Sequence, residues 1–168
     1  MAEQSEDRVG VYLDFDNIVI SRYNQLHGPN QFALDKARHH SSSHPKADPA
    51  VTARIQLAMI DIGAVLDYAS SFGAIVISRA YADWSAAVNA RYQRHPTDRA
   101  VDLIQRFPTV ASLKNGADIR LAIDVMEDSF RLAGLSHIVV VAGDSDYIPL
   151  AQRCKRLKWA RKGPVFRR

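Results

Sequence analysis

Apolar runs and apolar positions at helical spacing alternate along this chain. Stretches rich in β-branched or aromatic residues predict strands over 9–15 (VGVYLDF), 74–82 (AIVISRAYA), 109–113 (TVASL) and 138–141 (IVVV). The last stretch has four consecutive β-branched residues, a pattern typical of a strand buried on both faces in the middle of a parallel sheet. We therefore expect 138–141 to be a central strand.

Apolar residues that recur every three or four positions predict the helices. A long helix is expected over 50–72, ended by Gly73, and two shorter ones over 86–94 and 97–107, divided by Pro96. A further helix is expected from about 117 to Gly134, and another begins near Pro149. The polar stretch 25–49 predicts a loop or insertion with one helical turn near 32–38. Strands and helices in alternation predict an α/β fold, in which a mainly parallel sheet lies between helical layers.

The length of 168 residues suits a single domain with its own core, so residues 1–168 are expected to form one domain. The net charge of +4 is unevenly distributed. Eight Lys or Arg and no acids follow Asp146, so residues 1–146 contain 14 basic and 18 acidic residues. The basic tail, about 153–168, is either a polyanion-binding segment or a solvated surface, and the sequence leaves both readings open.

The single cysteine, Cys154, excludes an internal disulfide and a cysteine-based zinc site. The apolar runs of the chain are shorter than the roughly 20 residues of a membrane span. The polar first ten residues lack the apolar core of a signal peptide. We therefore expect a cytoplasmic protein with no membrane partner.

Acidic residues follow three of the predicted strands. Asp14 and Asp16 end the first, Asp118 lies in the first turn of the helix after the third, and Asp144 and Asp146 follow the fourth. In open α/β sheets, ligands bind beyond the carboxyl ends of the strands, where these side chains would converge. Each acid viewed alone could instead cap a helix.

Converging carboxylates repel one another unless they are protonated or bind a hard cation such as Mg²⁺ or Mn²⁺. This pattern predicts metal-assisted hydrolysis of a phosphodiester. If Asp14 and Asp16 stay in one extended strand, both point to the same face. Asp124 lies six residues after Asp118, about 120° around a helix, so the two cannot point at one site.

Other chemistry is weakly indicated. The sequence contains no P-loop, GxGxxG or Gly-x-Ser-x-Gly motif. The histidines His39, His40 and His44 are expected to be exposed loop residues rather than a metal site. We expect six side chains to contact a nucleic acid: Arg79, Trp84, Lys114, Arg153, Lys155 and Lys158. For Trp84, packing in the core is the alternative.

Three segments, in order, carry a resemblance to a known family: YLDFDNI (12–18), KNGADIRLAIDVM (114–126) and VVVAGDSDYIPL (139–150). From Val9 to Leu157 the chain resembles the NYN domain family, PIN-like nucleases that include LabA-like bacterial proteins. The resemblance implies a PIN-like α/β/α sandwich and a Mg²⁺- or Mn²⁺-dependent endoribonuclease acting on single-stranded RNA. It implies metal binding by Asp14, Asp118, Asp144 and Asp146, with Asn17 as a polar catalytic-site residue.

The chain departs from the family pattern in two places. The polar insertion at 35–49 is longer than the pattern needs, and KWARKGPVFRR stands where the family has another apolar strand. The sequence leaves open whether the last strand is present and whether the protein forms a homodimer.

Two other functions are compatible with parts of the sequence. A phosphatase resembling the haloacid dehalogenase group would use Asp14 as nucleophile, Ser78 at a strand end and Lys114, but this reading leaves Asp118 unexplained. An RNA-binding or regulatory module of the same fold would have little or no cleavage activity. Sequence alone favours the nuclease over both.

Overall fold

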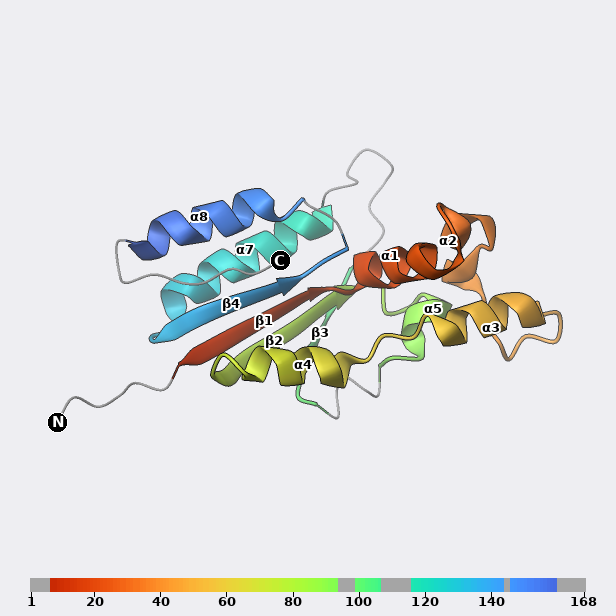
Figure 1. Ribbon diagram of the computed structural model, residues 1–168, viewed down its shortest axis with the longest axis horizontal. Coiled ribbons are helices and arrows are strands. Elements are labelled where there is room, and N and C mark those ends of the chain that lie inside the picture. Colours follow the sequence, from red (N-terminus) through yellow and green to blue (C-terminus); the bar gives the residue numbers. More distant parts are fainter. Residues whose placement is uncertain (1–6, 94–98, 107–115, 144–145, 160–168) are drawn as a thin grey trace.

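The structure is a computed structural model that describes residues 7–93, 99–106, 116–143 and 146–159, with the backbone alone described at 116–118 and 157–159. Its elements follow one another as shown in Figure 1: β1 (Arg8–Asp14), α1 (Phe15–His27), α2 (Gln31–Leu34), η1 (Ala37–His39), α3 (Pro49–Leu57), α4 (Ile62–Ser70), β2 (Ala74–Ala82), α5 (Ala87–Ala90), β3 (Asp102–Gln105), α7 (Gly116–Arg131), β4 (Leu135–Val141) and α8 (Ile148–Trp159).

The four described strands form one all-parallel sheet in the order β3-β2-β1-β4. Strand β1 lies between β2 and β4, and six of its seven residues are buried. Strand β4 is at the edge of the sheet in the described part of the chain, and its residues 139–141 are only partly buried. The expectation that IVVV is the central strand was therefore wrong; β1 occupies that place.

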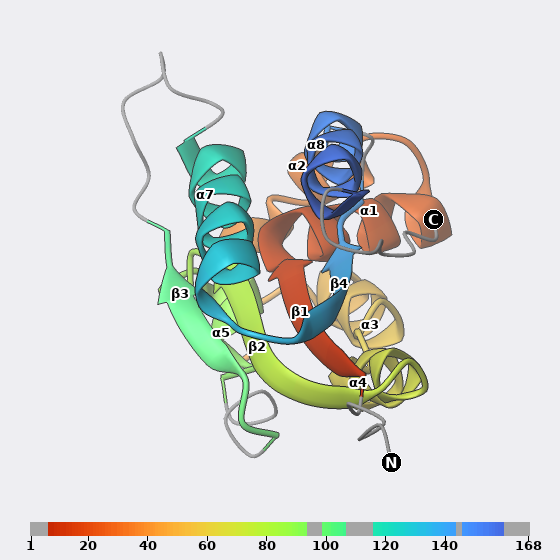
Figure 2. The ribbon, with the colours of Figure 1, turned by 90° about the vertical axis from the view of Figure 1, so that its left-hand side faces the viewer.

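The pleat of β1 divides the core into two parts. Val9, Val11 and Leu13 point to one face and pack with residues of α1, α3 and α4, whereas Tyr12 points to the other face and packs with residues of α7 and α8. Figure 2 shows α7 and α8 above the curved sheet and α3 and α4 below it. The α/β prediction of a parallel sheet between helical layers is confirmed.

The helix predicted over 50–72 is two helices, α3 and α4, because the chain breaks at 58–61. The carboxylate of Asp61 accepts a hydrogen bond from the Ala64 N–H at 3.0 Å and starts the second helix. By length and composition alone the stretch Pro49–Ser70 could cross a membrane. Each nine-residue helix rises only about 14 Å, less than half of a bilayer core of about 30 Å.

The segment 97–107, predicted as a helix, contains strand β3 instead. Its residues 102–105 pair with 79–82 of β2, and the Arg106 N–H extends the ladder by donating to the Ala82 carbonyl at 2.8 Å. Pairing with a neighbouring strand has overridden the local helical pattern. The helix predicted over 86–94 is the single turn α5, and the strand predicted at 109–113 lies outside the described residues.

The polar insertion is folded onto the domain. Helix α1 runs to His27, and the predicted helical turn corresponds to α2 and η1, whose Phe32 and Ala37 are buried. Asp35 accepts hydrogen bonds from the Tyr23 hydroxyl at 2.5 Å and from Arg54 at 2.8 Å, which ties the insertion to α1 and α3. The first half of the insertion thus packs against the core, whereas residues 42–46 are exposed.

Candidate functional site

Asp14 is the last residue of the central strand, and its side chain is 2% exposed. It shares a face of the sheet with Tyr12, two residues earlier, and so points toward α7 and α8. The Tyr147 hydroxyl donates to its Oδ2 at 2.9 Å, and Nη1 of Arg106 lies 3.3 Å from its Oδ1. Three segments distant in sequence thus meet at this carboxylate.

Asp16 lies in the first turn of α1, because the strand ends at Asp14 rather than continuing through both acids. The two side chains therefore do not share a strand face, contrary to the extended-strand expectation. The Asp83 N–H donates to Asp16 Oδ2 at 3.0 Å, and the Asn89 amide donates to Oδ1 at 2.6 Å. Arg106 lies 3.6 Å from Asp16 and connects it to Asp14.

Asp83, directly after β2, belongs to the same network. Burial alone would raise the pKa of its carboxyl group, but hydrogen bonds from Ser85, Gln105 and Arg38 outweigh burial and lower that pKa. Arg38, on the insertion, lies 3.0 Å from Asp83 and 3.7 Å from Asp16. We call this set the carboxyl-edge cluster; its members are Asp14, Asp16, Asp83, Arg38 and Arg106.

Asn17 lies next to the end of β4. The Ser21 hydroxyl donates to Asn17 Oδ1 at 3.1 Å and lies 3.3 Å from the Gly143 carbonyl. A Cβ added at Gly143 would lie 2.0 Å from Ser21 Oγ and 2.4 Å from Asn17 Oδ1. Only glycine allows this approach of the β4 end to α1.

The other predicted metal ligands are described only in part. Helix α7 begins at the carboxyl edge of the sheet (Figure 1), and Asp118 lies in its first turn. The side chain of Asp118 and all of Asp144 lie outside the described residues, whereas Asp146 is described and exposed. Within the described ranges, no group of three or more His, Cys, Asp or Glu is arranged to hold a metal ion.

The position of Asp14 and Asp16 nevertheless suits a divalent cation, because a positive charge already lies against both carboxylates. That charge is the guanidinium of Arg106. Carboxylate oxygens are the ligands that Mg²⁺ and Mn²⁺ prefer. A metal held here would use Asp14 directly and would take over the position of that guanidinium.

A second buried acidic network lies under α7. We call it the helix-face cluster, and its members are Asp124, Asp128, Tyr12, Tyr81 and Arg79. Asp128 accepts from the Tyr12 hydroxyl at 2.9 Å and from Arg79 at 2.5 Å, and Asp124 accepts from the Tyr81 hydroxyl at 2.7 Å. Burial and the adjacent carboxylates raise the pKa of both tyrosines, so these hydroxyls remain protonated donors.

Two of the predicted nucleic-acid contacts lie in the interior. The Arg79 side chain is 15% exposed and paired with Asp128. Trp84 is 5% exposed and stacks on Phe15 with ring centroids 5.3 Å apart, which is the core-packing alternative. Arg153 and Lys155 are exposed on α8, whereas Lys114 and the side chain of Lys158 lie outside the described part of the chain.

The histidines of the insertion, His40 and His44, each have a hydrogen-bond partner. His40 shares a hydrogen bond with the Thr52 hydroxyl at 2.8 Å, and His44 Nδ1 accepts from the Lys46 N–H at 3.1 Å. His39 and His44 are exposed, as expected of loop residues.

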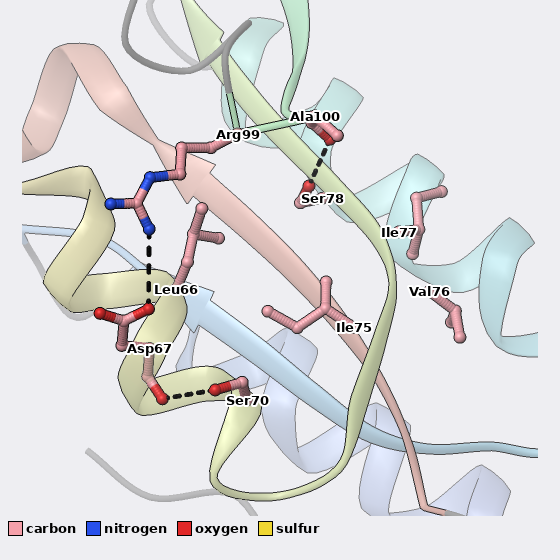
Figure 3. A pocket seen from close by; sticks show the side chains of 9 residues that line it. All are labelled: Leu66, Asp67, Ser70, Ile75, Val76, Ile77, Ser78, Arg99 and Ala100. Carbon is pink, nitrogen blue, oxygen red and sulfur yellow. Dashed lines mark hydrogen bonds and ion pairs between the residues drawn. The ribbon is translucent and has the colours of Figure 1, made fainter.

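A hollow of about 360 Å³ lies away from the acids, between α4 and the first half of β2 (Figure 3). It is lined by Leu66, Ile75 and Ile77, and Arg99 pairs with Asp67 beside it at 3.7 Å. Ser78 faces this region within β2 and donates to the Ala100 carbonyl at 3.0 Å. A strand-end serine next to Asp14, as the phosphatase reading requires, is therefore not found at Ser78.

The residues of the carboxyl-edge cluster and its surroundings that were not predicted include Tyr147, Arg106, Arg38 and Asp83. Tyr147 directly follows the Asp144-Ser145-Asp146 segment, so its position next to the acids was the available signal. Arg106 could not be found in this way, because its segment was predicted as a helix rather than as a strand with its carboxyl end at the same edge.

Comparison with known proteins agrees with this geometry. The NYN domain family model matches residues 8–160, which is most of the chain. No curated protein and no solved structure matches the chain significantly. The matched range contains all four described strands and the acids at their carboxyl ends. The chain therefore belongs to the NYN domain family and has its PIN-like, nuclease-type α/β fold.

Proposed function

We propose that this protein is a metal-dependent endoribonuclease that hydrolyses phosphodiester bonds of single-stranded RNA. One observation carries the proposal: Asp14, a buried carboxylate at the end of the central strand of an NYN domain, lies beside the end of β4 and has a cation against it. Buried acids at the carboxyl edge of a parallel sheet are placed for ligand chemistry.

In this proposal Asp14, Asp118, Asp144 and Asp146 hold Mg²⁺ or Mn²⁺. The bound ion would lower the pKa of a water molecule and stabilise negative charge on the phosphate. The Tyr147 hydroxyl fixes the orientation of Asp14 through Oδ2, and the ion would take the place of the Arg106 guanidinium at Oδ1. Asn17, held by Ser21, offers a polar side chain next to the Gly143 backbone.

The RNA would reach this edge from the side of α8, whose exposed Arg153 and Lys155 begin the basic tail. Such cations supply affinity that depends on salt but not on sequence. Removal of residues 158–168 should therefore weaken RNA binding and flatten its salt dependence.

The proposal is tested with purified protein, a 5′-labelled single-stranded RNA and either Mn²⁺ or EDTA. We expect cleavage with Mn²⁺ and none with EDTA, and we expect Asp14→Asn and Asp144→Asn each to abolish cleavage. Asp67→Asn is the matched control, since it removes the same charge from an exposed position beside the hollow at β2.

Two outcomes would replace the proposal with one of the alternatives. If the wild-type protein binds RNA without cleaving it, and Asp144→Asn binds RNA with the same affinity, the protein is a binding or regulatory module. EDTA-insensitive release of phosphate from a small monoester would support the phosphatase with Asp14 as nucleophile.

A further inference from the structure

Arg106 forms ion pairs with both Asp14, at the end of β1, and Asp16, in the first turn of α1. Its backbone N–H is fixed to β2 through the Ala82 carbonyl, so the root of the side chain is anchored in the sheet. The side chain is 25% exposed and extends from the end of β3 across to the end of β1. The guanidinium therefore lies on the solvent side of a carboxylate that is itself buried.

The contacts of this guanidinium are long for ion pairs. It lies 3.3 Å from Asp14 and 3.6 Å from Asp16, whereas charge-assisted hydrogen bonds are usually about 2.7–2.9 Å. Arg79, in the helix-face cluster, lies 2.5 Å from Asp128. Arg106 is thus held more loosely than the structural arginine of the same sheet.

The two acids keep other donors when Arg106 moves away. Asp14 accepts from the Tyr147 hydroxyl, and Asp16 accepts from the Asn89 amide and the Asp83 N–H. Loss of the guanidinium would leave neither carboxylate without a hydrogen bond. A divalent ion at Asp14 would replace the positive charge of Arg106 and would repel the guanidinium at the same time.

We propose that Arg106 is an exchangeable cation: it occupies Asp14 in the metal-free protein and binds a phosphate of the RNA once a divalent ion has taken its place. The inference rests on the proposed function, because it assigns a substrate contact at the same site. Guanidinium groups match phosphate oxygens in geometry and charge, and the anchored backbone keeps the displaced group close to Asp14.

A purely structural role makes the opposite prediction for metal binding. If Arg106 only positions Asp14 and Asp16, its removal should loosen Mn²⁺ binding. If it competes with the metal, its removal should tighten Mn²⁺ binding while RNA binding weakens. The two readouts therefore move in opposite directions only for an exchangeable cation.

The experiment compares the wild-type protein, Arg106→Ala and the control Arg131→Ala. Arg131 is the last residue of α7, is 60% exposed and pairs with Asp128. It lies at the edge of the sheet opposite the acids, so Arg131→Ala removes the same charge far from Asp14. Mn²⁺ is titrated calorimetrically without RNA. We expect Arg106→Ala to bind Mn²⁺ about fivefold more tightly, as loss of a partly exposed ion pair implies, and Arg131→Ala to match the wild type.

RNA recognition is measured as the KM for the labelled single-stranded RNA in Mn²⁺ at several salt concentrations. For Arg106→Ala we expect KM to rise about tenfold and the slope of its logarithm against log salt to flatten by about 0.7, the value for one lost phosphate contact on a single strand. In EDTA, fluorescence anisotropy should show the same RNA affinity for both proteins, because Asp14 then holds the guanidinium.

Looser Mn²⁺ binding by Arg106→Ala, or an unchanged salt slope of KM, would overturn the inference while leaving the nuclease proposal intact. A wild-type protein that neither binds Mn²⁺ nor cleaves RNA would overturn both. Arg106→Lys gives a further check: it keeps the charge but not the planar fork, and should restore most of the salt slope with less of the affinity.

Discussion

Two buried clusters of aspartate and arginine lie on this sheet, and they are built differently. In the helix-face cluster, Asp124 and Asp128 each accept a tyrosine hydroxyl, and Arg79 lies 2.5 Å from Asp128. In the carboxyl-edge cluster, Asp14 has one tyrosine donor and a guanidinium 3.3 Å away that is 25% exposed. The first cluster contains a tightly paired arginine, Arg79, whereas the arginine between the two acids of the second, Arg106, is held more loosely.

The difference indicates what each cluster does. The buried charges of the helix-face cluster are paired and hydrogen-bonded, and they join α7 to β1 and β2. Removing one partner from such a network is costly. A carboxylate at a strand end with a loosely held cation is suited to ligand binding. We therefore expect changes under α7 to lower stability and changes at the carboxyl edge to lower activity, and the following variants test that separation.

The largest effect is expected for Asp128→Ala. Its carboxylate is 1% exposed, and its loss leaves the Tyr12 hydroxyl and the Arg79 guanidinium without their partner. The free energy of unfolding, measured with urea, should fall by about 3–5 kcal/mol. Asp67→Ala, at an exposed ion pair, should change it by less than about 0.5 kcal/mol. Equal small losses in both variants would show that the helix-face cluster does not stabilise the fold.

Asp14→Asn should act mainly on the reaction. The amide keeps the size of the side chain and can still accept the Tyr147 hydrogen bond, but it loses the charge that binds a metal. We expect kcat to fall at least about a hundredfold, with a change in Tm of only a few degrees. A large loss of Tm with full activity of the remaining folded protein would reverse the assignment of the two clusters.

Gly143→Ala should affect both properties. The added methyl group would overlap Ser21 Oγ and Asn17 Oδ1, so the end of β4 must move away from α1. Overpacking of this kind costs about 1–3 kcal/mol. Ser21→Gly in the same chain should recover part of the loss, since it removes the nearest atoms. No recovery would mean that the strain lies elsewhere.

The smallest effect is the pH dependence that arises from Asp83. Its pKa is lower in the folded protein than in the unfolded chain, so its stabilising contribution is complete above the unfolded value of about 3.9 and is lost as the pH falls through the folded value. Asp83→Asn should lower stability by about 1 kcal/mol at pH 7 and less at pH 3. An equal loss at both pH values would show that the charge of Asp83 contributes nothing.

Local patterns predicted the elements that also dominate the fold. The β-branched run of β2 matches the predicted strand 74–82, and the amphipathic α7 was found with its end near Gly134. In the sheet, β1 is a central strand and the IVVV segment, in β4, lies at the edge of the described strands. The order of strands depends on which strands pair, and a single apolar run carries no information about pairing. The strand β3 was missed for the same reason.

The candidate site was predictable only where acids follow strands. Asp14 lies at the predicted edge, and α7 starts there with Asp118 in its first turn. Tyr147 and Arg106 were not predicted as its partners, because they reach Asp14 across separations of 133 and 92 residues. Such contacts follow from the topology of the sheet and leave no local pattern.

Paramagnetic broadening by Mn²⁺ in an amide NMR spectrum tests the central claim most directly, because it locates the ion without requiring turnover. We predict that substoichiometric Mn²⁺ broadens the amides of Asp14, Asn17 and Gly143, leaves those of His39, His40 and the hollow at β2 sharp, and has no such effect on Asp14→Asn. Broadening centred on the histidines, or an equal effect on the wild type and Asp14→Asn, would contradict a metal site at the carboxyl edge.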